Sequence, residues 1–300
     1  MPRKIIYLIN PISGTREKTS LKNLIVQKTN EQRIPFEILP TVESGDYSFV
    51  KQRIYEDKFT DVIICGGDGT ANQVVQSLAD TQTRFGIIPM GSGNGLAFSA
   101  GIPKASARAL EVVFTGKARL TDAFMVNKQF ACMLCGLGLD AQVAHQFADH
   151  PKRGLATYAS LTTRNFFSAK AYPFRVRANK LEFTTEAFFL SVANSNQFGN
   201  NFTIAPQAIL SDGLLDVVIV KKIAKPLLLL TVLRQVLAGQ IKRIENSLRS
   251  PVIYFQTEEI IIQNTGNAPM HIDGEPCESQ AELHIKILPL YFKLIHASTS

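Results

Sequence analysis

The chain has 300 residues, 45% of them hydrophobic, which is enough for two globular domains with a core in each. No apolar run approaches the roughly 18 residues that a membrane-spanning helix needs. Lys and Arg number 32 against 25 Asp and Glu, a formal net charge of +7, but no basic run exceeds two residues. The charge therefore predicts no nucleic-acid partner, and we expect either weak attraction to anionic lipid headgroups or plain solvation of the surface.

The chain contains four cysteines: Cys65, Cys132, Cys135 and Cys277. So few thiols suit a reducing cytoplasm better than a disulfide framework. Residues 1–4 lead directly into an apolar strand, so we expect no signal peptide, no lipidation site and a cytoplasmic location. Cys132 and Cys135 have the spacing of half a metal motif, but the apolar run 130–135 and the lack of a second pair predict a core strand.

From residue 1 to about 121, apolar strands alternate with helical stretches, which predicts an α/β domain with a parallel sheet. Helices are expected over 20–31, 72–78 and 105–115. Three strands run into glycine-containing loops: 4–9 into Asn10-Pro11-Ile12-Ser13-Gly14, 61–65 into Gly66-Gly67-Asp68-Gly69-Thr70, and 84–88 into Pro89-Met90-Gly91-Ser92-Gly93-Asn94-Gly95.

These loops predict a phosphate-binding site, because the carboxyl ends of parallel strands are where open α/β sheets bind ligands. Glycines let backbone N–H groups approach a polyphosphate closely, and a helix N-terminus adds partial positive charge. Asp68 is tolerable beside phosphate oxygens only if a metal ion or a metal-bound water lies between, which indicates Mg²⁺. No P-loop and no Gly-x-Gly-x-x-Gly helix start occurs, so neither a P-loop NTPase nor a dinucleotide oxidoreductase is predicted.

From residue 122 to about 287 the chain is rich in strands, which predicts an antiparallel β-sandwich. Strands are expected over 174–178, 186–192, 215–220, 259–262 and 283–287. Between Pro226 and Ile244, apolar residues recur at helical spacing. Such a helix either covers a sheet or docks on a membrane.

The chain resembles the diacylglycerol and sphingosine kinase family of lipid kinases over nearly its whole length, because six motifs occur in the family's order. They are Asn10–Gly14, Gly66–Thr70, Pro89–Asn94, Gly136–Ala141, Ala205-Pro206 with Ser211–Gly213, and Asp273–Glu275. The resemblance implies a nucleotide-binding domain like those of phosphofructokinases and NAD kinases over 1–121 and a β-sandwich lipid-binding domain over 122–287. It also implies that 288–300 returns to the first domain.

The implied activity is that of an ATP-dependent lipid kinase of phospholipid metabolism, which uses Mg²⁺ and phosphorylates a hydroxyl of a diacylglycerol-like or sphingoid-like lipid. The resemblance implies nucleotide contacts from Asn10, Pro11, Ile12, Ser13, Gly14, Thr41, Gly66, Gly67, Gly69, Thr70, Asn72, Gly91, Ser92 and Asn94. Asp68 would organise Mg²⁺, Glu275 would be the general base, and Asp273 would be its metal or network partner. The expected partner is a lipid at a membrane surface, with peripheral membrane contact, and homo-oligomerisation is left open.

Three motifs allow a second interpretation each. Asp212, with the carbonyl groups of Ile209 and Leu214, matches a structural Mg²⁺ site of bacterial members, but Asp212-Gly213 is also an ordinary turn. Asp273-Gly274 alone would signal a hairpin turn. Asp140 is a candidate for binding a substrate hydroxyl or amine, or for capping a loop.

The substrate class stays open in the sequence. Gly95 stands where bacterial diacylglycerol kinases typically carry a second acid, which weakens a diacylglycerol assignment without establishing a sphingoid one. NAD kinases share the Gly-Gly-Asp-Gly loop and the two-domain plan, so an NAD kinase-like phosphotransferase is one alternative. A catalytically inactive nucleotide-binding regulator is another, although such a protein would be expected to lack Asp68 or Glu275.

Overall fold

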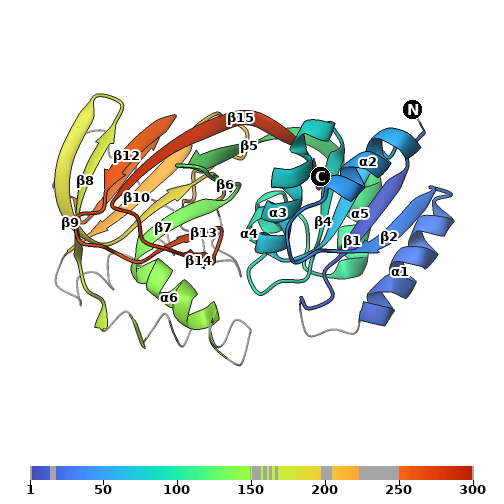
Figure 1. The fold of residues 1–300 in the computed structure, drawn as a ribbon, viewed down its shortest axis with the longest axis horizontal. Coiled ribbons are helices and arrows are strands. Elements are labelled where there is room, and N and C mark those ends of the chain that lie inside the picture. Colours follow the sequence, from blue (N-terminus) through green and yellow to red (C-terminus); the bar gives the residue numbers. More distant parts are fainter. Residues whose placement is uncertain are drawn as a thin grey trace. The chain divides into compact units, whose positions relative to one another are not determined.

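The computed structural model describes residues 2–13, 18–148, 150, 157, 161, 164–165, 168–196, 205–222 and 250–298. The chain divides into two compact units, Met1–Thr121 with Leu290–Ser300, and Asp122–Pro289 (Figure 1). The sequence placed the start of the returning segment at residue 288. Gly14 and the expected helix between Pro226 and Ile244 lie outside the described residues.

The first unit is an α/β domain built on a parallel sheet. Its strands lie in the order β2 (Phe36–Pro40), β1 (Ile5–Ile9), β3 (Asp61–Gly66) and β4 (Arg84–Pro89). Every residue of β1 and β3 is buried. Continuous apolar runs of this kind are typical of parallel strands that helices cover on both faces.

The helices of this unit are α1 (Lys18–Glu31), α2 (Ser48–Asp57), α3 (Asp68–Leu78), α4 (Gly95–Ser99) and α5 (Ser106–Thr115), with the 3₁₀ turn η1 (Ala79–Thr81). The chain moves outward from β1 to β2 and then back across β1 to β3. Right-handed connections therefore place α1 and α2 on opposite faces of the sheet. The observed packing agrees, because α1 lies beside α5 and α2 lies beside α3.

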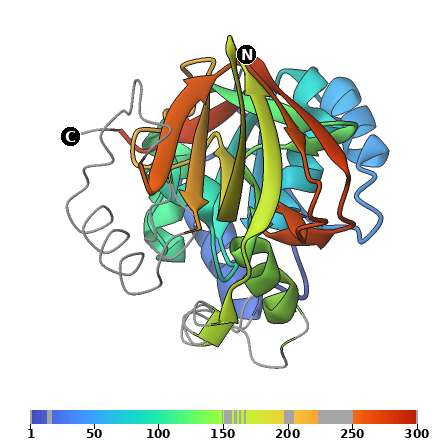
Figure 2. The same ribbon diagram turned by 90° about the vertical axis from the view of Figure 1, so that its left-hand side faces the viewer.

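The second unit is rich in antiparallel strands, which Figure 2 turns toward the viewer. Its elements are β6 (Gln129–Ala131), β7 (Leu134–Gly138), α6 (Leu139–Ala148), β8 (Tyr172–Ala178), β9 (Leu181–Ala193), β10 (Leu215–Lys221), β11 (Val252–Thr257), β12 (Glu259–Gln263), β13 (Met270–Ile272) and β14 (Glu275–Cys277). Two longer strands, β5 (Lys117–Val126) and β15 (Glu282–His296), have residues in both units.

The burial pattern of the strands shows which of their faces pack inside the second unit. Strands β8 and β12 alternate buried and more exposed residues, so one face of each is packed. Strand β10 is buried on both faces, because Val217 and Ile219 enter one hydrophobic cluster while Val218 and Val220 enter another. The predicted fold class, an α/β domain followed by a β-sandwich domain, is confirmed.

Strand β15 is longer than the sequence predicted. The expected strand 283–287 pairs antiparallel with β12, but the same strand continues to His296 and pairs in parallel with β4 through Lys293 and Leu294. One element therefore adds hydrogen bonds to the sheets of both units.

The expected core strand over 130–135 is interrupted. β6 ends at Ala131 and β7 begins at Leu134, with a bend at Cys132 and Met133. The backbone N–H groups at this break donate to the side chain of Asp273. The apolar sequence pattern predicted the burial of this segment but not the side chain that interrupts its strand.

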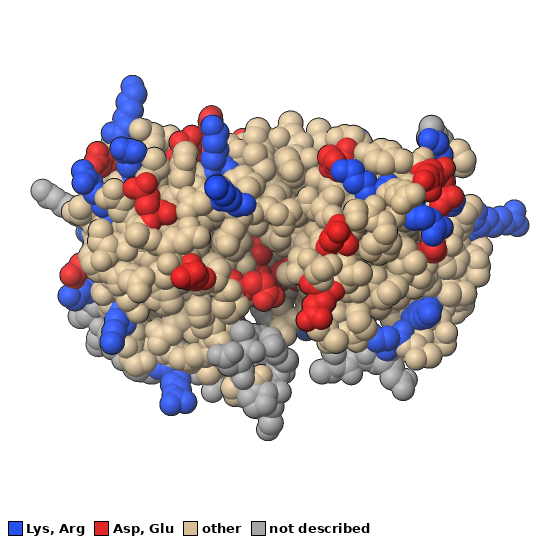
Figure 3. Space-filling model, viewed as in Figure 1, with Lys and Arg blue, Asp and Glu red and all other residues tan. Residues whose placement is uncertain are grey.

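The positive charge is dispersed. On the face drawn in Figure 3, described Lys and Arg side chains are spread over the surface without forming one continuous patch. None of the helices in the described part of the chain is long and apolar enough to cross a membrane.

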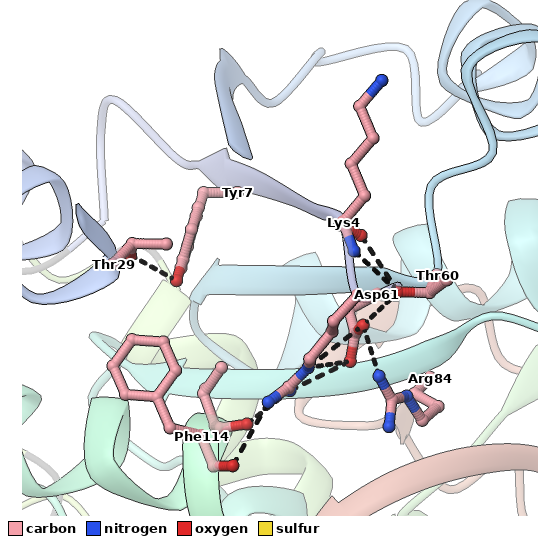
Figure 4. A network of polar contacts seen from close by, with 9 residues as sticks. Lys4, Tyr7, Thr29, Thr60, Asp61, Arg84 and Phe114 are labelled. Atoms are coloured by element: carbon pink, nitrogen blue, oxygen red, sulfur yellow. Dashed lines mark hydrogen bonds and ion pairs between the residues drawn. The ribbon is translucent and has the colours of Figure 1, made fainter. Parts of the chain in front are cut away.

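The amino ends of the parallel strands meet at a buried carboxylate. Asp61, the first residue of β3, is fully buried. Figure 4 shows its contacts with the arginines Arg3 and Arg84. Arg3 Nη2 lies 3.1 Å from Asp61 Oδ1, and Arg84 Nη2 lies 2.6 Å from Asp61 Oδ2. Arg3 also donates to the carbonyl oxygen of Phe114, which ties α5 to this edge of the sheet.

We expect Asp61→Asn to lower the free energy of unfolding of the first unit by about 3 kcal/mol, because it leaves two arginines facing each other without a carboxylate. Urea denaturation measures the change. The matched control is Asp80→Asn, since Asp80 is 62% exposed and pairs with Lys51, and its cost should stay below about 1 kcal/mol. Equal costs for the two variants would contradict the role of Asp61.

The pKa of His296, at the end of β15, is lowered from 6.5 to about 4 by burial and by the charge of Arg119. In the unfolded chain the imidazole takes up its proton near the ordinary pKa of about 6.5. Because the unfolded state then binds more protons, stability should fall as the pH drops through this window. We expect the urea midpoint of His296→Gln to fall less than that of the wild type between about pH 7 and about pH 4.5. Parallel pH profiles would contradict this assignment.

Candidate active site

Four loops follow the neighbouring strands β2, β1, β3 and β4 at the carboxyl edge of the parallel sheet. Asn10 follows β1 and donates its N–H to the carbonyl of Cys65 at 3.0 Å. Thr41 follows β2 and donates its N–H to the carbonyl of Ile9 at 3.1 Å. Sheet hydrogen bonding thus continues past the strand ends and fixes where the loops start.

The side chain of Asn10 ties the first loop to helix α3. Its Nδ2 donates to Thr70 Oγ1 at 2.8 Å, and its Oδ1 accepts the N–H of Ile12 at 3.0 Å. Ser13 Oγ donates to the carbonyl of Asn10 at 3.3 Å. Pro11 and Ile12 are exposed, so this loop has open surface beside a fixed polar base.

The loops after β3 and β4 touch through glycines. A Cβ atom on Gly91 would lie 2.6 Å from Cα of Gly67, so the backbones approach too closely for a side chain. Asn94 closes the second loop, because its Oδ1 accepts the N–H of Gly91 and its Nδ2 donates to the carbonyl of Gly91, both at 2.8 Å. Asn94 adopts a φ of 65°, a left-handed conformation that asparagine tolerates.

Asp68 joins these loops through its carboxylate. Its Oδ2 accepts the N–H of Asn94 at 2.6 Å and the N–H of Gly95 at 3.1 Å. The sequence predicted an acid for Mg²⁺ at this position and did not predict these two bonds. The acid therefore has a structural role in addition to any metal contact.

The remaining predicted nucleotide residues lie around this point. Gly69 and Asn72 are partly exposed in the first half of α3, and Ser92 is partly exposed in the loop after β4. Gly66 packs against the Thr70 side chain, where an added Cβ would lie 2.7 Å from Thr70 Cβ.

The arrangement fits a nucleotide polyphosphate with Mg²⁺. The surface at Gly67 and Gly91 is bare backbone, and the first-turn N–H groups of the 11-residue helix α3 have no acceptor within the helix. Among the described residues, no group of three or more His, Cys, Asp or Glu side chains could hold a metal alone. Mg²⁺ commonly takes one or two carboxylates and completes its shell with phosphate and water, so Asp68 suffices as a protein ligand.

In the second unit, Asp273 and Gly274 form the tight turn between β13 and β14. Both have positive φ values, 49° and 84°, and Ile272 pairs with Glu275 across the turn. This is the geometry of a two-residue hairpin, for which Asp-Gly is a preferred sequence. Asp273-Gly274 therefore forms the hairpin turn that the sequence allowed. This turn orients Glu275, the residue that follows.

Asp273 anchors this turn to the break between β6 and β7. Its Oδ1 accepts the N–H groups of Met133 and Leu134, and its Oδ2 accepts that of Cys132, all at 2.9 Å. The residue is 3% exposed. Three donors on a buried carboxylate favour the network role over a metal ligand.

Glu275, by contrast, is exposed at the start of β14. Backbone pairing and the anchored turn fix its position, while its carboxylate faces solvent. That combination suits an acid that must meet a substrate proton.

Sequence reasoning missed His271, which is buried two residues before Asp273. Its Nδ1 accepts the N–H of Gly274 at 3.2 Å, and its Nε2 lies 3.5 Å from Asp140 Oδ2. A lone histidine in a short apolar strand carries no local signal of such contacts.

Asp212 and Gly213 also form a turn, as the second interpretation of this motif predicted. Asp212 is exposed, and its Oδ1 accepts the N–H of Leu214 at 3.1 Å. Gly213 has a φ of +72°, and Ile209 is 57% exposed. The turn accounts for this motif without an ion, and the structural Mg²⁺ with Ile209 and Leu214 stays a prediction.

The Cys132 and Cys135 pair is buried, and burial raises the pKa of the Cys135 thiol well above its ordinary value. The thiol of Cys132 donates toward Asp273 Oδ2 at 3.4 Å. A protonated buried thiol is inert, in agreement with a packing role.

Comparison with known proteins identifies the family. Residues 4–126 match the model of the diacylglycerol kinase catalytic domain, and residues 134–296 match that of the YegS C-terminal NAD kinase beta sandwich-like domain. The chain therefore belongs to the YegS family of diacylglycerol kinase-like lipid kinases, which agrees with the resemblance to diacylglycerol and sphingosine kinases that the six motifs indicated.

Two relatives illustrate the similarity. A "Probable lipid kinase YegS-like" protein of Chromohalobacter salexigens is 29% identical over 245 residues, covering 79% of this chain and 76% of that protein. The "Lipid kinase YegS" of Escherichia coli K12 is 26% identical over 268 residues, covering 86% and 85% of the two chains.

Solved structures share the fold. A crystal structure of a diacylglycerol kinase from Bacillus anthracis str. Sterne has a TM-score of 0.76 at 19% identity, covering 98% of this chain and 97% of that one. A second crystal structure from the same organism reaches a TM-score of 0.81 at 23% identity, with the same coverage. At these identities the likeness shows the fold alone.

We expect Asp273→Asn to lower the free energy of unfolding of the second unit by about 2 kcal/mol, because an amide offers one accepting oxygen to three backbone donors. Denaturation in urea measures this. Glu275→Gln is the comparison, since an exposed substitution should change stability by less than about 0.5 kcal/mol. An unchanged midpoint for Asp273→Asn would show that the anchor is dispensable.

Proposed function

We propose that the protein transfers the γ-phosphoryl group of ATP to a hydroxyl of a lipid, either diacylglycerol-like or sphingoid-like. The observation that carries the proposal is the fixed and exposed Glu275 in the Asp-Gly-Glu turn, together with the backbone-lined loops around Asp68. Both features lie in domains that match lipid kinase families.

In the proposed nucleotide site, the loops after β1, β3 and β4 position the phosphate groups. The N-terminal N–H groups of α3 and the backbone at Gly67 and Gly91 face the phosphates, and Asn10 and Thr70 hold the first loop against α3. Asp68 would hold Mg²⁺ directly or through water. The ion would supply neutralisation of phosphate charge.

In the proposed transfer, Glu275 accepts the proton of the lipid hydroxyl. The hydroxyl oxygen forms a bond to the γ-phosphorus as the bond between that phosphorus and the bridging oxygen of ADP breaks. The products are a phosphorylated lipid and ADP. Asp273 positions Glu275 by holding the turn and does not itself meet the substrate.

NAD is a second candidate acceptor of the phosphoryl group, because the family model that matches the second unit describes an NAD kinase beta sandwich-like domain. The test is phosphate transfer from γ-labelled ATP to diacylglycerols, sphingoid bases, other lipid alcohols and NAD in parallel. Transfer to a lipid supports the proposal. Transfer to NAD alone, or binding of ATP without any transfer, overturns it.

We expect Glu275→Gln to reduce lipid phosphorylation by roughly a hundredfold to ten-thousandfold while the affinity for ATP stays nearly constant, because the amide cannot accept the proton. Single-turnover rates and equilibrium ATP binding measure the two effects. The matched control is Glu278→Gln, an exposed glutamate three residues further along the chain.

A collapse of ATP affinity in Glu275→Gln would place that residue in the nucleotide or metal site. Retained turnover would place the general base elsewhere, with Asp68 the first alternative.

A further inference from the structure

Behind the Asp-Gly-Glu turn, two ionisable side chains face each other in the interior of the second unit. His271 on β13 is fully buried, and the side chain of Asp140 in the first turn of α6 is 10% exposed. His271 Nε2 lies 3.5 Å from Asp140 Oδ2. Asp140 Oδ1 accepts the N–H of Ala141 at 2.9 Å, which turns Oδ2 toward the histidine.

The hydrogen bond on the other ring nitrogen fixes the tautomer of His271. Its Nδ1 accepts the N–H of Gly274, so in the neutral ring the proton lies on Nε2. The nearest carboxylate oxygen to this nitrogen is Asp140 Oδ2, at 3.5 Å, a contact that does not meet the geometry of a hydrogen bond. The imidazole thus contacts the turn that carries Glu275 on one side and the start of α6 on the other.

A glycine makes the space for this pair. Gly136 on β7 pairs with His271 in the sheet, and a Cβ there would lie 2.1 Å from Asp140 Oδ2 and 2.4 Å from His271 Nε2. Any other residue at this position would separate the two side chains. Helix α6 is held a second time, because His145 Nε2 hydrogen-bonds the carbonyl oxygen of Met270 at 2.8 Å.

We propose that His271 is a positioning residue that couples the carboxylate of Asp140 to the Gly274-Glu275 turn. The proposal rests on the proposed function, in which Glu275 accepts the proton of the acceptor hydroxyl. Asp140, placed by His271, then orients the polar head of the acceptor relative to that base. A burial role alone would need neither the defined tautomer nor the facing carboxylate.

The two contacts of His271 can be removed separately. In His271→Asn, Oδ1 replaces Nδ1 as the acceptor for Gly274, while the donor toward Asp140 is lost. In His271→Gln, the side-chain amide replaces Nε2 as the donor toward Asp140, while the acceptor for Gly274 is lost. Gly136→Ala keeps both residues and pushes the carboxylate away from the ring. The matched control is His284→Gln, since His284 is 52% exposed and pairs with Glu259 on the sandwich surface.

The kinetic test uses the lipid acceptor found in the transfer assay. We expect His271→Asn and Gly136→Ala to raise KM for the lipid by about tenfold with kcat within about threefold of the wild type. We expect His271→Gln to lower kcat by about tenfold with a smaller change in KM. KM for ATP should stay constant in all three, and His284→Gln should match the wild type.

The spectroscopic test does not depend on activity. The chain has five histidines, so ¹⁵N-labelled imidazoles give few resonances. His271 should show an unprotonated Nδ1 and a protonated Nε2, and Asp140→Asn should shift the Nε2 resonance. This measurement also shows whether each variant is folded.

The proposal is overturned if Nδ1 carries the proton, if Asp140→Asn leaves Nε2 unmoved, or if His271→Asn and His271→Gln change stability but leave both kinetic constants as in the wild type. If the wild type phosphorylates none of the acceptors, the proposed function fails. The imidazole resonances then still decide whether His271 couples Asp140 to the turn.

Discussion

Gly67 and Gly91 lie so close that the loops after β3 and β4 share one surface of bare backbone. Much of the first unit's site depends on this contact. It brings the N-terminus of α3 beside the start of α4, within reach of the single carboxylate of Asp68. With the loop after β1 bound to Thr70, three strand ends become one rigid edge. A polyphosphate would meet donors whose positions are already fixed, so little ordering remains to oppose binding.

In the second unit, as in the first, an aspartate side chain accepts hydrogen bonds from the backbone of a distant loop, but it is more deeply buried. Asp68 and Asp273 are both acids in glycine-containing motifs, and both accept backbone N–H groups from a distant loop. Asp68 remains partly exposed, whereas Asp273 is 3% exposed and has three such donors. In the Asp-Gly-Glu turn, the carboxylate of Asp273 is therefore occupied by backbone hydrogen bonds, whereas Glu275 is exposed. Two acidic residues two positions apart thus lie in opposite environments, Asp273 buried and Glu275 exposed.

Local sequence patterns predicted the strands β1, β3 and β4, the helices α1, α3 and α5 and the glycine-containing loops, but not the helices α2 and α6. The apolar runs of β1 and β3 indicated a covered parallel sheet, and alternation in β8 and β12 indicated a sandwich. Contacts between distant segments left no such pattern. Nothing near Cys132 reveals that an acid about 140 residues later interrupts its strand, and nothing near Gly136 reveals the pair it accommodates. Such contacts are set by tertiary packing, which the hydrophobic periodicity of a sequence does not report.

Strand β15 has a consequence for the order in which the protein is built. Its last residues pair with β4 and belong to the first unit, although more than 150 residues of the second unit lie between them in the chain. During synthesis from the N-terminus, the edge of β4 must therefore wait for this strand until nearly the whole chain has been made. An open strand edge is a template for pairing with other chains. The nascent protein is thus expected to pass through a stage in which its first unit is vulnerable to aggregation, and the long sequence separation slows the pairing that ends this stage.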